Sequence, residues 1–439
     1  MREGDTGLAV LACGMVFCFF LDICPSSRKN KEKREKLMGD FFQSGAISTL
    51  HRLGHRDLES LELELKRHRR LRPVALILPA VYAEFEGEAL PTILRQLKDV
   101  GYLNEIVLVM NRTDAMEFRS AKKTLTDLGL NIDIVWSSGP RVTDLYKLLE
   151  ENNLHLGEDG KGRSVWIAFG YVIANEKSDV IVLHDCDIVN YNRDFLARLC
   201  YPMANPNLGY EFCKGFYSRV TDRMYGRVTR LYFTPLIRAL QKIVGYHTFL
   251  VYLDSFRYPL AGEFSLDLDL ARATRIPSDW GLEVGILAEV YRNCVPKRIC
   301  QVDLIESYEH KHQDLSSADP TAGLLKMCID ITKSLFRTLT QEGVIISDGL
   351  LRTLAGTYLR AAQDTIKKYE DDAAINNLFF DRHAEGTAVD TFLQGLRIAG
   401  DEFLKDPLGS PEIPNWNRVT SAIPDFLEKL KEAVAADNK

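Results

Sequence analysis

The sequence lacks the cysteine pairs that mark a zinc ribbon or a disulfide framework. None of its nine cysteines forms a C-x-x-C spacing, and Cys200, Cys213 and Cys328 lie among apolar residues. Scattered thiols of this kind are typical of a reducing compartment, so we expect a cytoplasmic protein. The chain also lacks a basic excess, because its formal net charge is −6. This balance argues against nucleic acid as a partner.

A convincing membrane span is missing as well. The uncharged apolar stretch at residues 7–21 is shorter than the ~20 residues that a transmembrane helix needs, and the basic run "RKNKEKREK" follows it. The leading "MREGDT" carries two acids against one arginine, unlike a secretory signal. Two interpretations stay open. Either the working protein starts at Met38, or residues 7–24 form a weak membrane anchor.

Apolar runs alternate with amphipathic segments between residues 73 and 188. The runs "VALILPA", "EIVLVMN", "NIDIVW" and "DVIVLHDCDI" predict buried strands with helical segments between them. Continuously apolar strands joined by helices predict a mainly parallel sheet with helices on both faces. Such an α/β fold binds nucleotides at the carboxyl ends of its strands. An amphipathic helix is expected over residues 48–72, and helices only from residue 321 onward.

Asp185 and Asp187 follow the last of these strands, one residue apart. Side chains i and i+2 of a strand lie on one face, so Cys186 should point away from both carboxylates. Two acids this close repel each other unless a cation lies between them, and Mg²⁺ or Mn²⁺ prefers hard oxygen ligands. We interpret the pair as a metal site, with a structural acid pair as the alternative. The second such pair, Asp267 and Asp269, is expected to begin a helix.

Seven short motifs then occur in order along the chain: "LPAVYAE", "GKGRSVW", "HDCD", "GRVTRL", "PLAGEF", "WGLEVGIL" and "QVDLIESYEHKH". In this order and spacing the chain resembles the glucosyl-3-phosphoglycerate synthases. These are retaining glycosyltransferases with a GT-A fold, related to mannosyl-3-phosphoglycerate and glucosylglycerate synthases. The resemblance covers residues 73–315. It implies transfer of glucose or mannose from a UDP- or GDP-hexose to 3-phosphoglycerate or glycerate, with Mg²⁺ or Mn²⁺.

The resemblance also implies roles for individual residues. The acid beside the reacting sugar is Glu283, and the "PLAGE" loop, with Leu260 and Gly262, supplies backbone contacts to that sugar. The metal ligands are Asp187 and His310. The contacts to the nucleotide sugar fall on Pro79, Ala80, Glu84, Lys161 and Asp185. The acceptor-binding residues are Gly226, Arg227, Val228, Thr229 and His312.

Four residues depart from the family pattern. Tyr82 and Ala83 stand where the family has Asn-Glu, Tyr308 replaces an arginine, and His312 replaces an asparagine. The lost charge at Tyr308 predicts a less steep preference for a phosphorylated acceptor. A near copy of the acceptor loop, "GPRVTDL", is instead expected to begin a helix, with Thr143 as its N-cap.

The chemistry of glycosyl transfer suggests how these groups act. Breaking the bond between the anomeric carbon and the diphosphate builds negative charge, which the metal and Lys161 can stabilise. Retention needs a carboxylate nucleophile or attack from the leaving-group side, and the resemblance favours the second, with Glu283 orienting the sugar. Two rival functions stay open. One is a sugar nucleotidyltransferase, although "PAVYAEFEGEAL" is a poor Gly-rich phosphate loop, and the other is a non-catalytic nucleotide-sugar-binding protein.

The domain organisation follows from these patterns. We expect an N-terminal extension over residues 1–37, a helical lead-in over 38–72, a GT-A catalytic domain over 73–320 and a helical domain over 321–439. The last of these is expected to serve packing or the formation of a homodimer.

Overall fold

The computed structural model describes residues 43, 45–54, 56–309, 319–409 and 412–439. The chain divides into residues 1–43 and residues 44–439, and the second unit is described below. The predicted extension at residues 1–37, including the possible anchor at 7–24, lies outside the described residues, as do His310 and His312. Within the described part of the chain, no helix is both long and apolar enough to span a bilayer.

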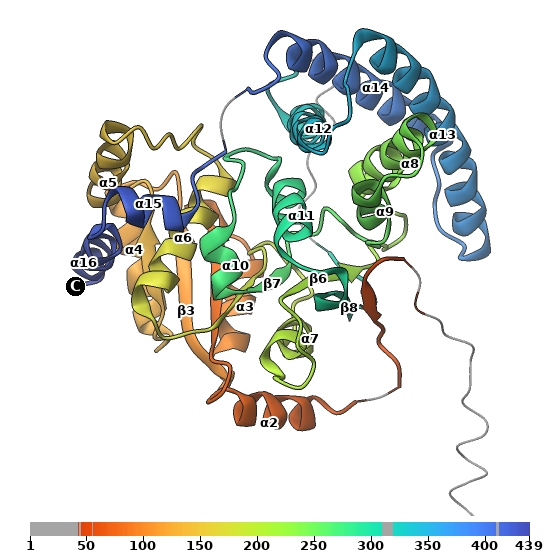
Figure 1. Ribbon diagram of the computed structural model, residues 1–439. Helices are drawn as coiled ribbons and strands as arrows, with labels where there is room; N and C mark the ends of the chain where they lie inside the picture. Colours follow the sequence, from red (N-terminus) through yellow and green to blue (C-terminus); the bar gives the residue numbers. More distant parts are fainter. Residues whose placement is uncertain (1–42, 44, 55, 310–318, 410–411) are drawn as a thin grey trace, which may run out of the picture. The chain divides into compact units, whose positions relative to one another are not determined.

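One eight-stranded sheet forms the centre of this unit, in the order β1-β8-β6-β7-β5-β2-β3-β4 (Figure 1). Strand β7 runs antiparallel to β5 and β6, and the other neighbouring strands pair in parallel. The predicted mainly parallel sheet is therefore confirmed. The strands are β1 (Ser48–Leu50), β2 (Val74–Ala80), β3 (Leu103–Met110), β4 (Asp133–Trp136), β5 (Val180–Leu183), β6 (Phe212–Tyr217), β7 (Phe264–Asp267) and β8 (Ile299–Ile305).

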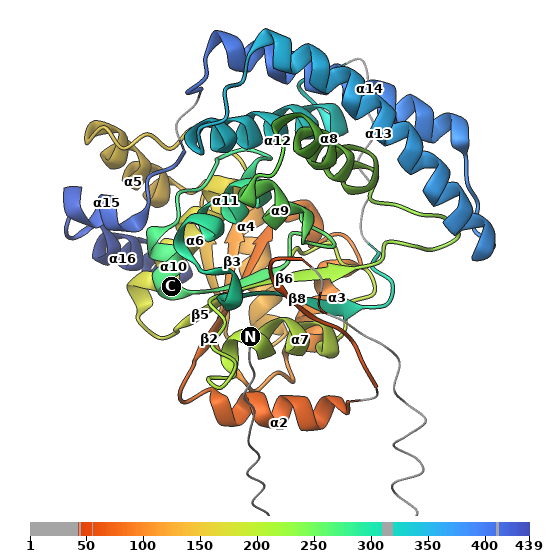
Figure 2. The same cartoon turned by 45° about the vertical axis from the view of Figure 1, so that its right-hand side comes forward.

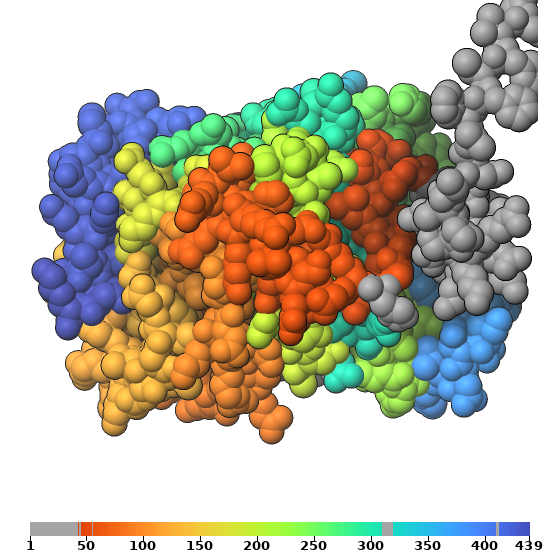
Figure 3. Space-filling model, turned by 90° about the horizontal axis from the view of Figure 1, so that it is seen from below, coloured from red at the N-terminus to blue at the C-terminus, as the bar shows by residue number. Residues whose placement is uncertain are grey.

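Helices cover both faces of the sheet, because strand side chains alternate between two separate apolar clusters. In β2, for example, Ala75 and Ile77 belong to one cluster while Leu76 and Leu78 belong to the other. Figure 3 shows α2 lying across one of these sides. That side carries α2 (Leu58–His68), α3 (Ala89–Leu97), α4 (Ala115–Asp127) and α7 (Arg193–Ala204). The opposite side carries α5 (Pro140–Glu151), α6 (Lys161–Asn175), α10 (Leu268–Ala273) and α11 (Leu282–Asn293).

The segment before α2 corrects one prediction. Residues 48–50 do not begin a helix but form the edge strand β1, parallel to β8. The Gln301 side chain donates to Thr49 Oγ1 over 2.9 Å, which ties this strand to its neighbour. The helix itself begins only after Asp57, whose carboxylate accepts from Ser60 N. The leucine spacing thus predicted the helix correctly but not where it starts.

The C-terminal region is helical, as predicted, but its helices pack in two places. The hairpin of α13 (Asp348–Ile375) and α14 (Arg382–Lys405), together with α12 (Gly323–Gln341), lies against α8 (Thr234–Val244) and the wide turn η2 (Val228–Phe233) (Figures 1 and 2). By contrast, α15 (Trp416–Ala422) and α16 (Phe426–Asn438) return to α6, where Trp416 stacks on Trp166.

The last helix also covers the edge of the sheet at β4. The Asn438 side chain accepts from Ile134 N over 3.0 Å and donates to Ile134 O over 2.8 Å. These are the two groups that an edge strand leaves unpaired, so one amide side chain takes the place of a neighbouring strand here. The proposed domain boundaries at residues 37, 72 and 320 stay predictions.

Candidate active site

The acid pair lies beyond the carboxyl end of β5, next to a buried histidine. His184 is fully buried beside Tyr191 and Phe195, and its Nδ1 lies 2.9 Å from the backbone oxygen of Asp185. Burial lowers the pKa of this imidazole to about 4, so His184 is neutral near pH 7. His184 therefore does not balance the negative charge of the acid pair that follows it.

Lys161 holds two of the predicted site residues together. Its ammonium lies 2.7 Å from Asp185 Oδ1 and 3.2 Å from Glu283 Oε1. Burial opposes the charged form, but the carboxylates of Asp185 and Glu283 outweigh it and raise the pKa of Lys161 above its ordinary value. Lys161 begins α6 and Glu283 lies in the first turn of α11. The end of β5, the start of α6 and the start of α11 thus meet at one charged centre.

The glycines on both sides of Lys161 explain why the motif reads "GKG". A Cβ on Gly160 would lie 2.4 Å from the backbone oxygen of Ser278, and one on Gly162 only 1.9 Å from that of Pro277. Any larger residue would push the start of α6 away from the loop before α11. The two glycines therefore set the distance between Lys161 and Glu283.

The "PLAGE" loop approaches the same centre from β7. A Cβ on Gly262 would lie 2.3 Å from Asp185 Oδ2, so only glycine lets this loop lie so close to the Asp185 carboxylate. The next residue, Glu263, is fully buried and accepts from the hydroxyls of Tyr217 (2.7 Å) and Tyr308 (2.6 Å). Burial and the charge of Asp185 raise the pKa of Glu263 above its ordinary value.

Tyr308 is thus part of the interior and not of an open acceptor pocket. It is 2% exposed and its ring stacks on Tyr217 with centroids 3.8 Å apart. The phenol therefore supports Glu263 from a position where the family has an arginine. Leu260, the other predicted residue of this loop, is half-buried against the core.

Lys214 on β6 is a second lysine at this centre that the sequence interpretation missed. It is 1% exposed, and within the described residues its Nζ has no hydrogen-bond partner. The ammonium lies over the Phe264 ring at 5.3 Å and within electrostatic reach of Glu283 and Glu263. Burial lowers its pKa to about 8. A charged residue inside the apolar run "FCKGFY" was the signal that could have found it.

The predicted nucleotide contacts lie at the end of β2. Pro79 and Ala80 are the last residues of that strand, and Glu84 ends the short turn η1 (Tyr82–Glu84). Tyr82, which replaces a family asparagine, donates to Ser120 Oγ on α4 over 3.0 Å. This tyrosine therefore links the turn to the neighbouring helix.

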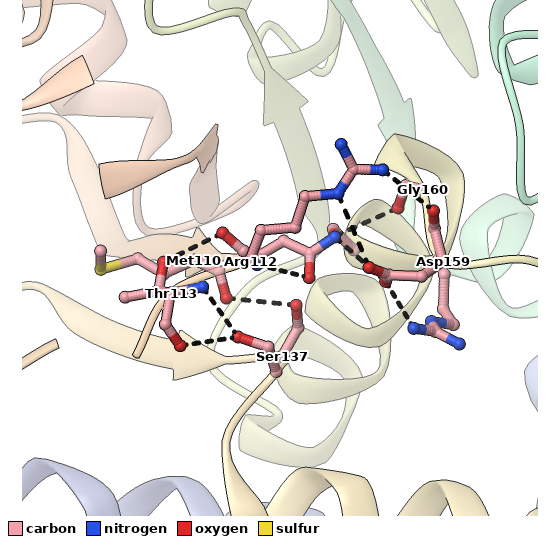
Figure 4. Close-up of polar contacts among 10 residues, drawn as sticks. Met110, Arg112, Thr113, Ser137, Asp159 and Gly160 are labelled. Atoms are coloured by element: carbon pink, nitrogen blue, oxygen red, sulfur yellow. Dashed lines mark hydrogen bonds and ion pairs between the residues drawn. The ribbon is translucent and has the colours of Figure 1, made fainter. Parts of the chain in front are cut away.

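A polar network at the carboxyl ends of β3 and β4 lies beside these residues (Figure 4). Asn111 donates to Asp159 Oδ1 over 3.1 Å and accepts from the backbone of Arg112, while Ser137 donates to the carbonyl of Met110. Arg112 has a φ of 50°, which is rare for a residue with a side chain. Their position after parallel strands could have marked these residues as binding candidates.

A cavity of about 540 Å³ adjoins this network, between α5 and the loop before α6. It is lined by Ser137, Ser138, Thr143, Tyr146, Lys147, Glu150, Glu151, Leu156, Asp159 and Arg163. The prediction that Thr143 caps α5 is wrong, because Gly139 is the N-cap and Pro140 the first helical residue. Proline is favoured there, since its missing N–H has no partner in the first turn. Asp267 and Asp269 do begin a helix, as expected: Asp267 immediately precedes α10, without a side-chain capping hydrogen bond, and Asp269 lies in its first turn.

The predicted acceptor loop lies against the C-terminal helices. Gly226 has a φ of +73°, which favours glycine. Val228 and Thr229 are buried within η2, so Arg227 is the residue of this loop whose side chain presents polar atoms to solvent. Its Nε donates to Glu385 Oε1 on α14 over 2.8 Å.

The composition of the charged centre fits a divalent cation. The carboxylates of Asp185, Glu263 and Glu283 lie around two lysines, Lys161 and Lys214, and Asp187 follows two residues after Asp185. Carboxylate oxygens are also the ligands that Mg²⁺ and Mn²⁺ prefer. Among the residues that the structure describes, no group of three His, Cys, Asp or Glu side chains is arranged so that it could hold a metal ion. The predicted ligand His310 lies outside those residues.

Sequence comparison with curated proteins shows the family to which the chain belongs. A glucosyl-3-phosphoglycerate synthase from Persephonella marina is 48% identical over 401 residues, covering 91% of this chain and 99% of that protein. The chain belongs to the glucosyl-3-phosphoglycerate synthases. A second member, from Methanococcoides burtonii, is 40% identical over 405 residues and covers 91% and 98% of the two chains. Membership in this synthase family makes the chain a glycosyltransferase, as the resemblance predicted. No family model matches the chain.

A solved structure supports the GT-A fold. The glucosyl-3-phosphoglycerate synthase from Mycobacterium tuberculosis, in complex with Mn²⁺, UDP-glucose and phosphoglyceric acid, superposes with a TM-score of 0.50. The match covers 67% of this chain and 88% of that one, at 23% sequence identity. The likeness concerns the fold, and the roles of individual residues are proposals.

Proposed function

We propose that the chain transfers glucose from UDP-glucose to 3-phosphoglycerate with retention of configuration, and that Mg²⁺ or Mn²⁺ is required. The observation that carries this proposal is the Lys161 ammonium between Asp185 and Glu283 at the carboxyl end of the sheet. Ligands of α/β sheets bind at this end. The names of the two relatives and the ligands of the Mycobacterium tuberculosis protein support the choice of donor, acceptor and cation.

On the donor side, we assign the nucleotide to Pro79, Ala80 and Glu84 at the end of β2, and the reacting diphosphate to Lys161. A diphosphate that gains negative charge as its bond to the sugar breaks is stabilised by a fixed ammonium in a partly buried site. Asp187 and His310 would hold the cation, which supplies further stabilisation of that leaving group when it is bound.

On the acceptor side, we assign the acid and phosphate groups to the Arg227 loop. The acceptor hydroxyl forms the new bond to the anomeric carbon from the face that the diphosphate leaves. Its proton passes to the departing diphosphate, which takes the electron pair of the broken bond. Glu283 keeps its contact with Lys161 and orients the sugar without attacking it, while the loop at Leu260 and Gly262 borders the sugar.

A matrix of four nucleotide sugars against glycerate and 3-phosphoglycerate tests this function. We expect UDP-glucose with 3-phosphoglycerate to give the highest turnover and excess chelator to abolish it. The departure at Tyr308 led us to predict some use of glycerate, but this side chain is buried against Glu263. The ratio of turnover with glycerate to turnover with 3-phosphoglycerate tests that prediction. Release of pyrophosphate from a sugar phosphate and a nucleoside triphosphate would instead identify a nucleotidyltransferase, and binding without turnover would identify a non-catalytic protein. A cytoplasmic homodimer is part of the same proposal, and sedimentation equilibrium measures the oligomeric state.

A further inference from the structure

The predicted acceptor loop is held by helices from beyond the predicted GT-A domain. The backbone N–H of Phe379, between α13 and α14, donates to the carbonyl of Asp222 over 2.8 Å. The Arg223 guanidinium lies 4.8 Å from the centre of the Phe379 ring. Backbone and side-chain contacts thus tie the start of this loop to the α13–α14 hairpin, more than 150 residues away in the sequence.

Glu385 on α14 ties down the end of the same loop. It is 4% exposed, and its two carboxylate oxygens face two different arginines. One oxygen accepts from Arg227 Nε over 2.8 Å, and the other forms an ion pair with Arg230 over 3.0 Å. Arg230 in turn donates to the carbonyl of Tyr225 and lies 4.7 Å from the centre of the Tyr369 ring on α13. A buried carboxylate between two guanidinium groups is held firmly, because loss of either partner would leave a buried charge unpaired.

The way in which Arg227 uses its guanidinium is informative. Glu385 occupies Nε, and across the described residues no partner is found for the two terminal nitrogens. Those terminal nitrogens form the fork that grips a carboxylate or phosphate in a bidentate manner. The Arg227 side chain is 39% exposed, so this fork remains accessible to a ligand. The Arg227 side chain is therefore held at Nε, while its two terminal nitrogens stay accessible to a ligand.

We propose that Glu385 is a positioning residue for the acidic acceptor, and that the α13–α14 hairpin forms part of the acceptor site. Glu385 acts through Arg227, because it fixes the direction of the fork before the acceptor arrives. This lowers the ordering that binding would otherwise require. The inference rests on the proposed function, which assigns the acceptor to the Arg227 loop.

The charges of the three side chains add a second consequence. Arg227 and Arg230 carry two positive charges and Glu385 one negative charge, so the group presents a net charge of +1 to a ligand. Removal of the carboxylate charge alone should strengthen the attraction for a phosphate. Removal of the whole side chain should also release Arg227. The two kinds of substitution therefore separate the geometric contribution from the electrostatic one.

Steady-state kinetics of Glu385→Ala and Glu385→Gln tests the proposal. We expect Glu385→Ala to raise the KM for 3-phosphoglycerate about tenfold, the size of one lost charge-assisted hydrogen bond. The KM for UDP-glucose and kcat at saturating acceptor should stay within about twofold. Glu385→Gln keeps an oxygen acceptor for Arg227 Nε and removes the negative charge, so its KM for 3-phosphoglycerate should be equal to or below that of the parent. The matched control is Glu402→Ala on the same helix, α14. It removes an exposed ion pair with Lys333 of α12 and should change neither KM.

The outcomes separate this inference from the function on which it rests. If Arg227→Ala raises the acceptor KM but neither Glu385 variant does, the positioning role is wrong and the proposed acceptor site stands. If Glu385→Ala raises both KM values together and lowers the melting temperature in proportion, its role is structural and the inference is also overturned. An unchanged acceptor KM in Arg227→Ala would overturn the acceptor site itself, and the inference with it. Should Glu385→Ala fail to fold, Glu385→Asp decides, because it keeps the charge but draws the carboxylate back from Arg227 Nε. The acceptor KM should then rise while the donor KM stays the same, and an unchanged ratio of the two KM values would overturn the inference.

Discussion

The proposed donor side and the proposed acceptor side of the active site are built in different ways. On the donor side, Asp185, Lys161 and Glu283 lie at the ends of elements that pack directly on the central sheet, and glycines fix the spacing. On the acceptor side, Arg227 lies in a loop whose position depends on Glu385, 158 residues later in the chain. A rigid sheet therefore positions the charges of the donor side, whereas a separate pair of helices positions the acceptor side.

This difference indicates which properties can change independently. Substitutions in the sheet move several charges of the donor side at once, since Asp185 contacts both Lys161 and the loop at Gly262. Changes in α13 and α14 can alter acceptor binding while the sheet stays intact. We expect donor binding to depend on the core and acceptor binding to depend on the helical region. Three predictions test this contrast, and a fourth concerns residues 1–37.

The largest effect is expected on the donor side, from Asp187→Ala. The substitution removes a proposed ligand of the cation, whose stabilisation of the leaving diphosphate contributes several kcal/mol to the transition state. We expect kcat to fall about a thousandfold or more, while circular dichroism shows an unchanged fold. Assays in excess Mg²⁺ and in excess chelator measure the effect. Full turnover by this variant, or by the parent enzyme in chelator, would contradict the metal assignment.

A somewhat smaller effect is expected from Lys214→Met, and it concerns how the free energy of unfolding of the protein depends on pH. The pKa of Lys214 is lowered from 10.5 to about 8 by burial. The unfolded chain therefore binds more protons than the folded one between these values. Its contribution to stability is fully present above pH 10.5 and is lost as pH falls through 8. Relative to the methionine variant, the free energy of unfolding of the parent should rise by about 3 kcal/mol between pH 7 and pH 10.5.

Urea unfolding of both proteins at pH 7, 8, 9 and 10 measures this difference. The exposed Lys242→Met is the matched control, and its curve should run parallel to that of the parent. If the free energy of unfolding of Lys214→Met also changes with pH in parallel with that of the parent, Lys214 does not titrate in this range.

On the acceptor side, Arg227→Ala should have a more selective effect. It removes the fork that we assign to the acid and phosphate of the acceptor, so the acceptor KM should rise roughly tenfold to a hundredfold. The donor KM should change little, because we assign the Arg227 loop to the acceptor and not to the donor. Initial rates with each substrate varied in turn give both values. An equal rise in both KM values would mean that the two sides are not separable.

The smallest effect is expected from removing residues 1–37. A chain that begins at Met38 should match the full chain in kcat and in both KM values. Fractionation of both forms with membranes is the accompanying measurement. The anchor interpretation gains support if only the full chain is active and sediments with membranes.

One part of the charged centre was indicated by local sequence, whereas the roles of Lys161 and Glu283 came only from the family resemblance and stay predictions. Asp185 and Asp187 follow an apolar strand, and the glycines beside Lys161 stand next to it in the sequence. The acceptor side could not be predicted to the same depth. Nothing near Arg227 indicates Glu385, since their pairing depends on how α14 packs against η2. The edge strand β1 was missed for a similar reason: three residues become a strand only because β8 offers them a partner.

The contact between Asn438 and the edge of β4 bears on how the protein is made. The backbone N–H and C=O of Ile134 pair with Asn438, which is synthesised 304 residues later. At a synthesis rate of about 5–20 residues per second, that interval lasts roughly 15–60 seconds. During this time the nascent nucleotide-binding half exposes an open strand edge to other chains. Newly made protein should therefore be most prone to aggregation just before its last helix leaves the ribosome.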